Sequence, residues 1–154
     1  MVFYPWLKSF EKINYINLDS CKLTEVPEEV FRFSNLSALS LDNNYLTTLP
    51  DSIINLHNLR SLYLSTNKIK TLPSNIGSLT SLESIYLSYN QIESLPSSFG
   101  NLKNLRSLYL ANNNLKAIPD TFKTLKLRIF NLLNNPTKDI PIFLKENLTL
   151  KLIK

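Results

Sequence analysis

The stretch LRSLYLSTNKIKTLPSNIGSLTS (residues 59–81) returns along the chain with a period of 23 residues. The best-matched copies place leucine or isoleucine in the same columns, followed by an asparagine, an apolar residue joined to proline, and a second apolar set. Copies begin without insertion at Ile13, Leu36, Leu59, Leu82 and Leu105, and a looser copy begins at Leu127. Self-similarity at a fixed period indicates an array of stacked repeats.

The two halves of each repeat have different periodicities. In the first half, the L-x-L segment alternates apolar and variable residues, which predicts a short strand with its leucines pointing inward. In the second half, apolar residues recur three apart, as at Ile53 and Leu56, which predicts a short helix or 3-10 turn. One proline per repeat precedes this segment, where its missing amide hydrogen leaves no bond unmade: Pro27, Pro50, Pro73, Pro96, Pro119 and Pro141.

These repeats resemble the leucine-rich repeat family over residues 13–149. The 23-residue length with Leu-Pro in the second half is similar to the intracellular subclass found in Ras-pathway scaffolds and many bacterial repeat proteins. The resemblance implies an α/β fold: a right-handed solenoid (a horseshoe arc) with a parallel β-sheet on the concave face and short helical or 3-10 turns on the convex face. We expect residues 1–154 to form a single domain, with residues 1–12 as an N-terminal half-repeat cap and residues 150–154 beginning a truncated last strand.

A column of asparagines accompanies the strands: Asn44, Asn67, Asn90, Asn113 and Asn135, with Cys21 in the equivalent place of the first repeat. A buried amide has to be hydrogen-bonded or it lowers stability. The resemblance implies that these amides bond to the backbone of their own and adjacent repeats, forming a structural ladder. It also implies that Cys21 is an accepted substitute, which we expect to be a buried, packed thiol.

The variable strand positions are expected to face solvent on the concave side. The position between the two strand leucines holds Tyr63, Tyr86 and Tyr109, with serines in the neighbouring columns. An aromatic centre with a polar rim is typical of protein-binding hot spots. We therefore predict partner-binding residues on this face: Tyr63, Tyr86, Tyr109, Tyr89, Asp42, Arg60 and Arg106. The alternative is that the tyrosines reflect repeat duplication, since residues 58–64 and 104–110 are the same heptapeptide, NLRSLYL.

Side chains that carry chemistry are scarce. The chain has one cysteine, one histidine and two glycines, and His57 falls in an expected convex turn, away from Cys21. Nucleophile, base and polarising groups do not converge, and no metal-ligand spacing appears. We therefore expect no catalytic residues, no cofactor and no metal, and we predict a non-enzymatic module that binds a protein partner.

Charge is distributed unevenly along the chain. Residues 1–102 carry seven bases and nine acids, whereas residues 103–154 carry ten bases and three acids. The basic C-terminal third supports a rival hypothesis, a nucleic-acid or anionic-surface binder, although Arg60 and Arg106 are opposed by Glu83. A narrower hypothesis is a bacterial leucine-rich repeat effector that acts on host signalling or ubiquitin-pathway proteins.

The start of the chain lacks the features of a secretory signal, and no stretch approaches the roughly 20 apolar residues that span a bilayer. With a single cysteine, this predicts a cytoplasmic protein, with delivery into a host cell without a Sec signal as the alternative. We expect a monomer, or a dimer formed through the open edge of the last strand.

Overall fold

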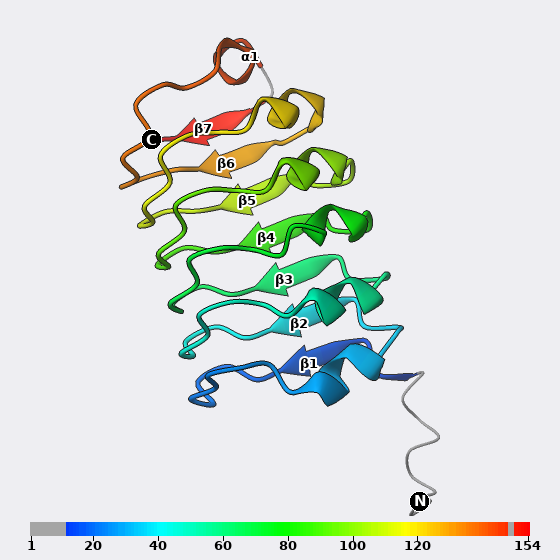
Figure 1. The fold of residues 1–154 in the computed structure, drawn as a ribbon. Helices are drawn as coiled ribbons and strands as arrows, with labels where there is room; N and C mark the ends of the chain where they lie inside the picture. Colours follow the sequence, from blue (N-terminus) through cyan, green and yellow to red (C-terminus); the bar gives the residue numbers. More distant parts are fainter. Residues whose placement is uncertain (1–11, 148–149) are drawn as a thin grey trace, which may run out of the picture.

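A computed structural model describes residues 12–147 and 150–154. Within them, seven strands of three residues each stack in sequence order into one parallel sheet (Figure 1). The strands are β1 (Tyr15–Asn17), β2 (Ala38–Ser40), β3 (Ser61–Tyr63), β4 (Ser84–Tyr86), β5 (Ser107–Tyr109), β6 (Ile129–Asn131) and β7 (Lys151–Ile153). The predicted parallel sheet is therefore confirmed. Residues 1–11, where the half-repeat cap is expected, lie outside the described part.

Short helical turns cross the other side of the stack (Figure 1). Five are 3-10 helices and the last described one is a single α-helical turn: η2 (Glu28–Arg32), η3 (Asp51–Asn55), η4 (Ile76–Ser78), η5 (Ser97–Asn101), η6 (Asp120–Thr124) and α1 (Ile142–Lys145). The regularly spaced prolines mark where the turns begin. Each proline carbonyl accepts a hydrogen bond from the amide three residues later, as Pro50 does from Ile53 at 3.1 Å. No helix in the described residues has the length and apolarity needed to cross a membrane.

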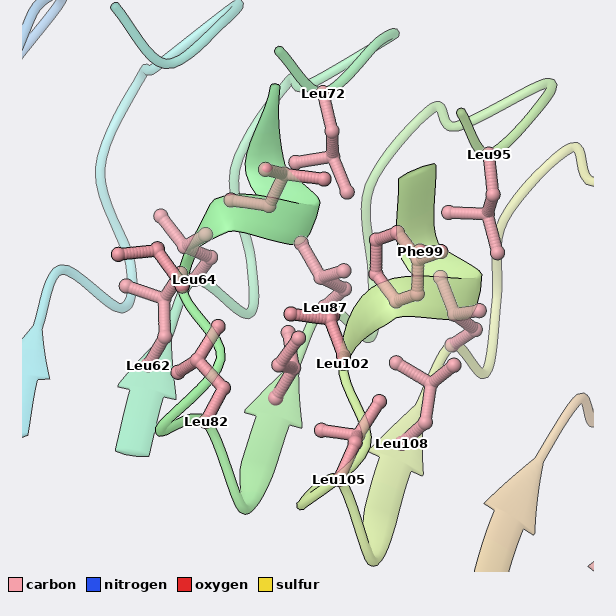
Figure 2. Close-up of a cluster of buried hydrophobic side chains, with 14 of the residues drawn as sticks. Leu62, Leu64, Leu72, Leu82, Leu87, Leu95, Phe99, Leu102, Leu105 and Leu108 are labelled. Carbon is pink, nitrogen blue, oxygen red and sulfur yellow. The ribbon is translucent and has the colours of Figure 1, made fainter. Parts of the chain in front are cut away.

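The hydrophobic core runs between the sheet and the turns as a continuous column. Figure 2 shows Leu62, Leu64 and Leu82 reaching from strands and loops toward Leu72 and Phe99 of the facing side. These strand leucines are almost completely inaccessible to solvent. Each such side chain contributes about 1.5–3 kcal/mol of burial free energy. Because the core repeats along the stack, each repeat depends on its neighbours to cover its apolar faces.

The 23-residue register shortens near the C-terminal end of the described chain. Strands β1 to β5 pair residues that are 23 apart, whereas β5 pairs with β6, and β6 with β7, at a spacing of 22, as Ser107 does with Ile129. The first of these repeats is one residue shorter in the loop between Leu125 and Leu127, which are two residues apart where Leu102 and Leu105 are three apart. Leu125 accordingly ends its turn with an extended ψ of 151°, where Leu102, at the equivalent place, has a ψ of 65°. The loop that follows η6 is therefore shaped differently from those before it.

The prediction that Cys21 is buried is wrong, because its side chain is exposed. Each asparagine of the column bonds to the repeat before its own, as the next repeat shows here. Asn44, from the next repeat, makes the bonds that hold this region, accepting from the amide of Leu23 at 2.9 Å and donating to the carbonyl of Leu18 at 2.9 Å. The thiol of Cys21 donates to the carbonyl oxygen of Asp19, at 3.5 Å.

Candidate functional site

Three tyrosines form a stack at the centre of the exposed sheet face. Tyr63, Tyr86 and Tyr109 end strands β3, β4 and β5 and pair in register. The ring centroids are 4.6 Å and 4.8 Å apart, with interplanar angles of 7° and 6°. These spacings match the separation of adjacent strands, about 4.8 Å, so the sheet itself sets the geometry of the stack. All three side chains are half-buried.

Within the stack, the faces of the rings contact one another. Both faces of Tyr86 lie against neighbouring rings, so an external partner can reach only the ring edge and the hydroxyl group, which also has a hydrogen bond with the Ser84 side chain. Burial, followed by the neighbouring phenols of Tyr63 and Tyr109, raises the pKa of Tyr86 above its ordinary value of 10.0. The Tyr86 hydroxyl therefore stays protonated at neutral pH and can donate as well as accept a hydrogen bond.

A row of residues with left-handed backbone follows the strand ends. Six equivalent residues have φ between 56° and 59°: Ser20, Asn43, Thr66, Tyr89, Asn112 and Asn134. Asparagine tolerates this region, and the amide of Asn134 donates to the side-chain oxygen of Asn112 at 2.8 Å. Within the described part of the chain, the side chain of Tyr89 makes no comparable bond, and the residue is 60% exposed. A bulky side chain held in this conformation costs about 1 kcal/mol or more, so Tyr89 is a strained, exposed aromatic residue.

Asp42, a predicted partner-binding residue, bonds to the next repeat. Its Oδ1 accepts the amide hydrogen of Ser65 at 2.6 Å, and Asp19 accepts the amide hydrogen of Asp42 in the same way at 2.8 Å. Burial raises the pKa of Asp42 above its ordinary 3.8, while the Ser65 hydrogen bond opposes this rise. The carboxylates therefore bridge repeats, a role that the sequence pattern did not predict. Its signal was the recurrence of aspartate at equivalent positions of consecutive repeats.

Charged residues line the opposite edge, where the strands begin. Nη1 of Arg60 lies 2.8 Å from Oε1 of Glu83, an ion pair between two exposed side chains that contributes little stability. Arg106 is the next residue in this column, and its amide donates to the carbonyl of Glu83 at 2.8 Å. Its guanidinium, however, donates to the carbonyls of Lys103 and Leu105, at 3.0 Å and 3.2 Å. The two predicted arginines therefore have different surroundings.

The predicted binding residues thus form three groups across one face. The tyrosine stack lies in the middle. Tyr89 and Asp42 follow the strand ends on one side, and Arg60 and Arg106 precede the strand starts on the other. An extended segment of a partner would meet all three groups only if it crossed the whole face.

The asparagine column lies beneath this surface and holds its loops. Nδ2 of Asn90 donates to the carbonyls of Leu64 and Leu87, at 2.8 Å and 3.0 Å, while Oδ1 accepts from the amide of Ile69 at 2.9 Å. One side chain therefore ties together two neighbouring repeats. The same pattern of bonds is made by Asn44, Asn67, Asn113 and Asn135.

Among residues 12–147 and 150–154, no three or more histidine, cysteine, aspartate or glutamate side chains gather in a way that could hold a metal ion. His57 is exposed in the loop between η3 and β3, and Cys21 is exposed after β1. These two side chains belong to different repeats.

Comparison with known proteins gives consistent results. A family model described as a leucine-rich repeat region matches residues 6–87 and 53–150. A leucine-rich repeat protein of Leptospira interrogans has a similar structure, with a TM-score of 0.88 and 33% identity over 97% of this chain and 38% of that one. An internalin of Listeria monocytogenes is also similar, with a TM-score of 0.72 and 26% identity over 84% of this chain and 37% of that one. The chain spans well under half the length of either protein. No curated protein sequence matches.

Proposed function

The chain belongs to the leucine-rich repeat family, and from this premise we propose that it binds a protein partner across the exposed face of its sheet. Repeat domains of this family typically bind proteins and are generally non-catalytic. The observation that carries the proposal is the stack of Tyr63, Tyr86 and Tyr109. Because each ring is already held by its neighbours, a partner gains a large amphipathic contact without ordering flexible side chains.

The strain at Tyr89 supports the same surface. An asparagine would satisfy the left-handed backbone at this position, as it does at Asn112 in the next repeat. The aromatic residue is exposed and adds to the contact area beyond the end of β4. Strain retained at an exposed aromatic residue is consistent with a binding role.

The nucleic-acid hypothesis draws less support from the same geometry. Single-stranded nucleic acid binds by stacking bases on aromatic faces. Here the faces of Tyr86 are covered by Tyr63 and Tyr109, and one face of each outer ring is covered as well. The exposed ring edges suit a protein surface better.

The hypothesis of an effector acting on host signalling or ubiquitin-pathway proteins stays a prediction, as do the cytoplasmic location and the monomeric state. Both similar structures come from bacteria, which is in keeping with a bacterial origin. This chain matches 37% of the internalin's length, so a shared activity does not follow from the likeness.

A variant with alanine at positions 63, 86 and 109 tests the proposal directly. We expect it to fold, because the rings lie on the surface side of the sheet, and to lose proteins that the wild type captures from a lysate, identified by mass spectrometry. Its matched control replaces three exposed turn residues, one per repeat, with alanine: Asn55, Ser78 and Asn101. Equal capture by the tyrosine variant and the wild type would reject the tyrosine stack as the binding site.

Tyr89→Asn is expected to raise the free energy of unfolding by about 1 kcal/mol, since it removes the strain of a bulky residue in left-handed backbone. The same variant is expected to weaken partner capture. Thr66→Asn, at nearly the same φ one repeat earlier, is the matched control and should gain stability without affecting capture. Urea denaturation measures the first effect. Unchanged capture by Tyr89→Asn would remove this residue from the binding surface.

A further inference from the structure

The shortened loop at Leu125–Leu127 lies beside a depression at the basic edge of the sheet. In two of the regular repeats, asparagine amides bridge successive loops at this edge: Asn58 donates to the carbonyl of Ser34 and Asn104 to that of Thr80, both at 2.9 Å. The shortened loop has no asparagine to make this bond. An open depression of about 440 Å³ lies here, lined by Arg106, Leu125, Lys126, Arg128 and Asn147.

Three positively charged side chains line the depression. Arg106, Lys126 and Arg128 form no ion pair within the described part of the chain, and none of the lining residues is acidic. The acid of the same column, Glu83, is paired with Arg60 instead. Because like charges held close together repel, an anion that contacts all three would be bound favourably.

The fold holds the guanidinium group of Arg106 and the main chain of Arg128. The guanidinium of Arg106 is fixed by the carbonyls of Lys103 and Leu105, and its remaining N–H groups make no bond within the described residues. The amide of Arg128 donates to the carbonyl of Arg106 at 2.7 Å, and the carbonyl of Arg128 accepts from the amide of Lys151 at 2.7 Å. This backbone ladder places the two arginines on adjacent repeats, at the same edge of the sheet.

We propose that this depression binds the phosphate group of a phosphorylated segment in the protein partner. The proposal rests on the proposed function, because it takes the partner to be a protein that crosses the tyrosine stack. Arg106 lies three residues before Tyr109 of that stack and directly precedes the same strand, β5. A phosphate monoester offers three acceptor oxygens and nearly two negative charges, which suits two guanidinium groups and one ammonium group better than a carboxylate does.

Fluorescent peptide pools with a fixed central residue test the proposal. We expect the wild-type chain to bind a phosphoserine pool at least about tenfold more tightly than pools with serine or glutamate at that position. Arg106→Gln combined with Arg128→Gln should abolish this preference. Lys70→Gln combined with Lys116→Gln removes the same charge from the loops beyond the strand ends and should retain it. If the double arginine variant does not fold, Lys126→Gln and Arg128→Gln singly should each weaken binding of the phosphoserine pool.

A titration with inorganic phosphate, followed by NMR, separates this proposal from the proposed function. We expect shifts confined to the amides around positions 106, 126–128 and 147, both in the wild type and in the variant with alanine at positions 63, 86 and 109. Equal binding of the serine and phosphoserine pools would overturn the proposal. An equal loss of phosphoserine preference in the Lys70/Lys116 control would also overturn it. So would displacement of the bound peptide by anionic vesicles or single-stranded DNA at a lower concentration of phosphate groups than unlabelled phosphopeptide needs. If the variant with alanine at positions 63, 86 and 109 shows the same phosphate-induced shifts as the wild type and captures the same proteins from a lysate, the tyrosine stack is rejected as the binding site. The phosphate site is not affected by that result.

Discussion

Replacing Asn90 with leucine is expected to lower the free energy of unfolding by about 3–5 kcal/mol. The amide hydrogen of Ile69 would lose its acceptor inside the core and remain unsatisfied. The carbonyls of Leu64 and Leu87 would each lose one of two donors and keep the other, from Asn67 and Asn113. The loss therefore combines one orphaned buried group with two weakened ones. Urea denaturation followed by circular dichroism measures the effect.

Asn114→Leu is the matched control, because this residue follows the column directly but is exposed. The same substitution there should change the free energy of unfolding by no more than about 0.5 kcal/mol. Asn135→Leu should fall between the two, since Asn135 is only half-buried. A denaturation midpoint for Asn90→Leu equal to that of the wild type would contradict the role of the asparagine ladder.

Gly77→Ala is expected to destabilise the protein by about 1–3 kcal/mol, which reverses the gain that glycine-to-alanine changes often bring within helical turns. The reason is space, because a Cβ at position 77 would lie 2.0 Å from the carbonyl oxygen of Ser98. That atom belongs to the backbone of η5, so the turns η4 and η5 would have to move apart. Gly77 thus allows these two turns to pack closely. Thermal and urea denaturation measure the loss.

Two comparisons show whether close packing is the cause. Gly100→Ala, one repeat later, would place its Cβ 2.6 Å from Cβ of Thr121 and should also destabilise. Ser78→Ala, next to Gly77 but exposed, should have little effect. If Gly77→Ala were as stable as the wild type or more so, the turns would have freedom that this packing does not allow.

Most of the fold could be predicted from the periodicity, because the same alternation of apolar and variable residues recurs in the repeats. The alternation around Leu62 and its counterparts predicted the strands, and the prolines predicted where the turns begin. The columns also placed Tyr63, Tyr86 and Tyr109 next to one another, since an unbroken period puts equivalent residues on adjacent strands. Repetition converts a sequence position into a spatial position, which an ordinary globular sequence does not do.

Several features of the surface could not be read from the columns. The sequence placed Glu83 between Arg60 and Arg106 without indicating that it pairs with Arg60, a choice made by rotamers and by nearby carbonyls. The columns predict that the carboxylate of Asp42 faces a partner, yet one of its oxygens is used by the next repeat. They predict a buried Cys21 because its column is buried elsewhere, but its side chain is exposed, and Asn44 of the next repeat makes the bonds to Leu18 and Leu23.

The repeat, the parallel sheet, the turns and the asparagine column can all be predicted from the sequence, because they follow from local periodicity and from polar groups that must be satisfied. Which charged side chains form ion pairs, and where the surface is hollow, became known from the three-dimensional structure. The repeat that contains Leu125 and Leu127 is one residue shorter, which is visible in the sequence, but the depression between Arg106 and Arg128 depends on contacts between repeats. Side-chain pairing and surface shape arise from contacts between repeats. The periodicity predicts which repeats are neighbours, but it does not predict which of their side chains touch.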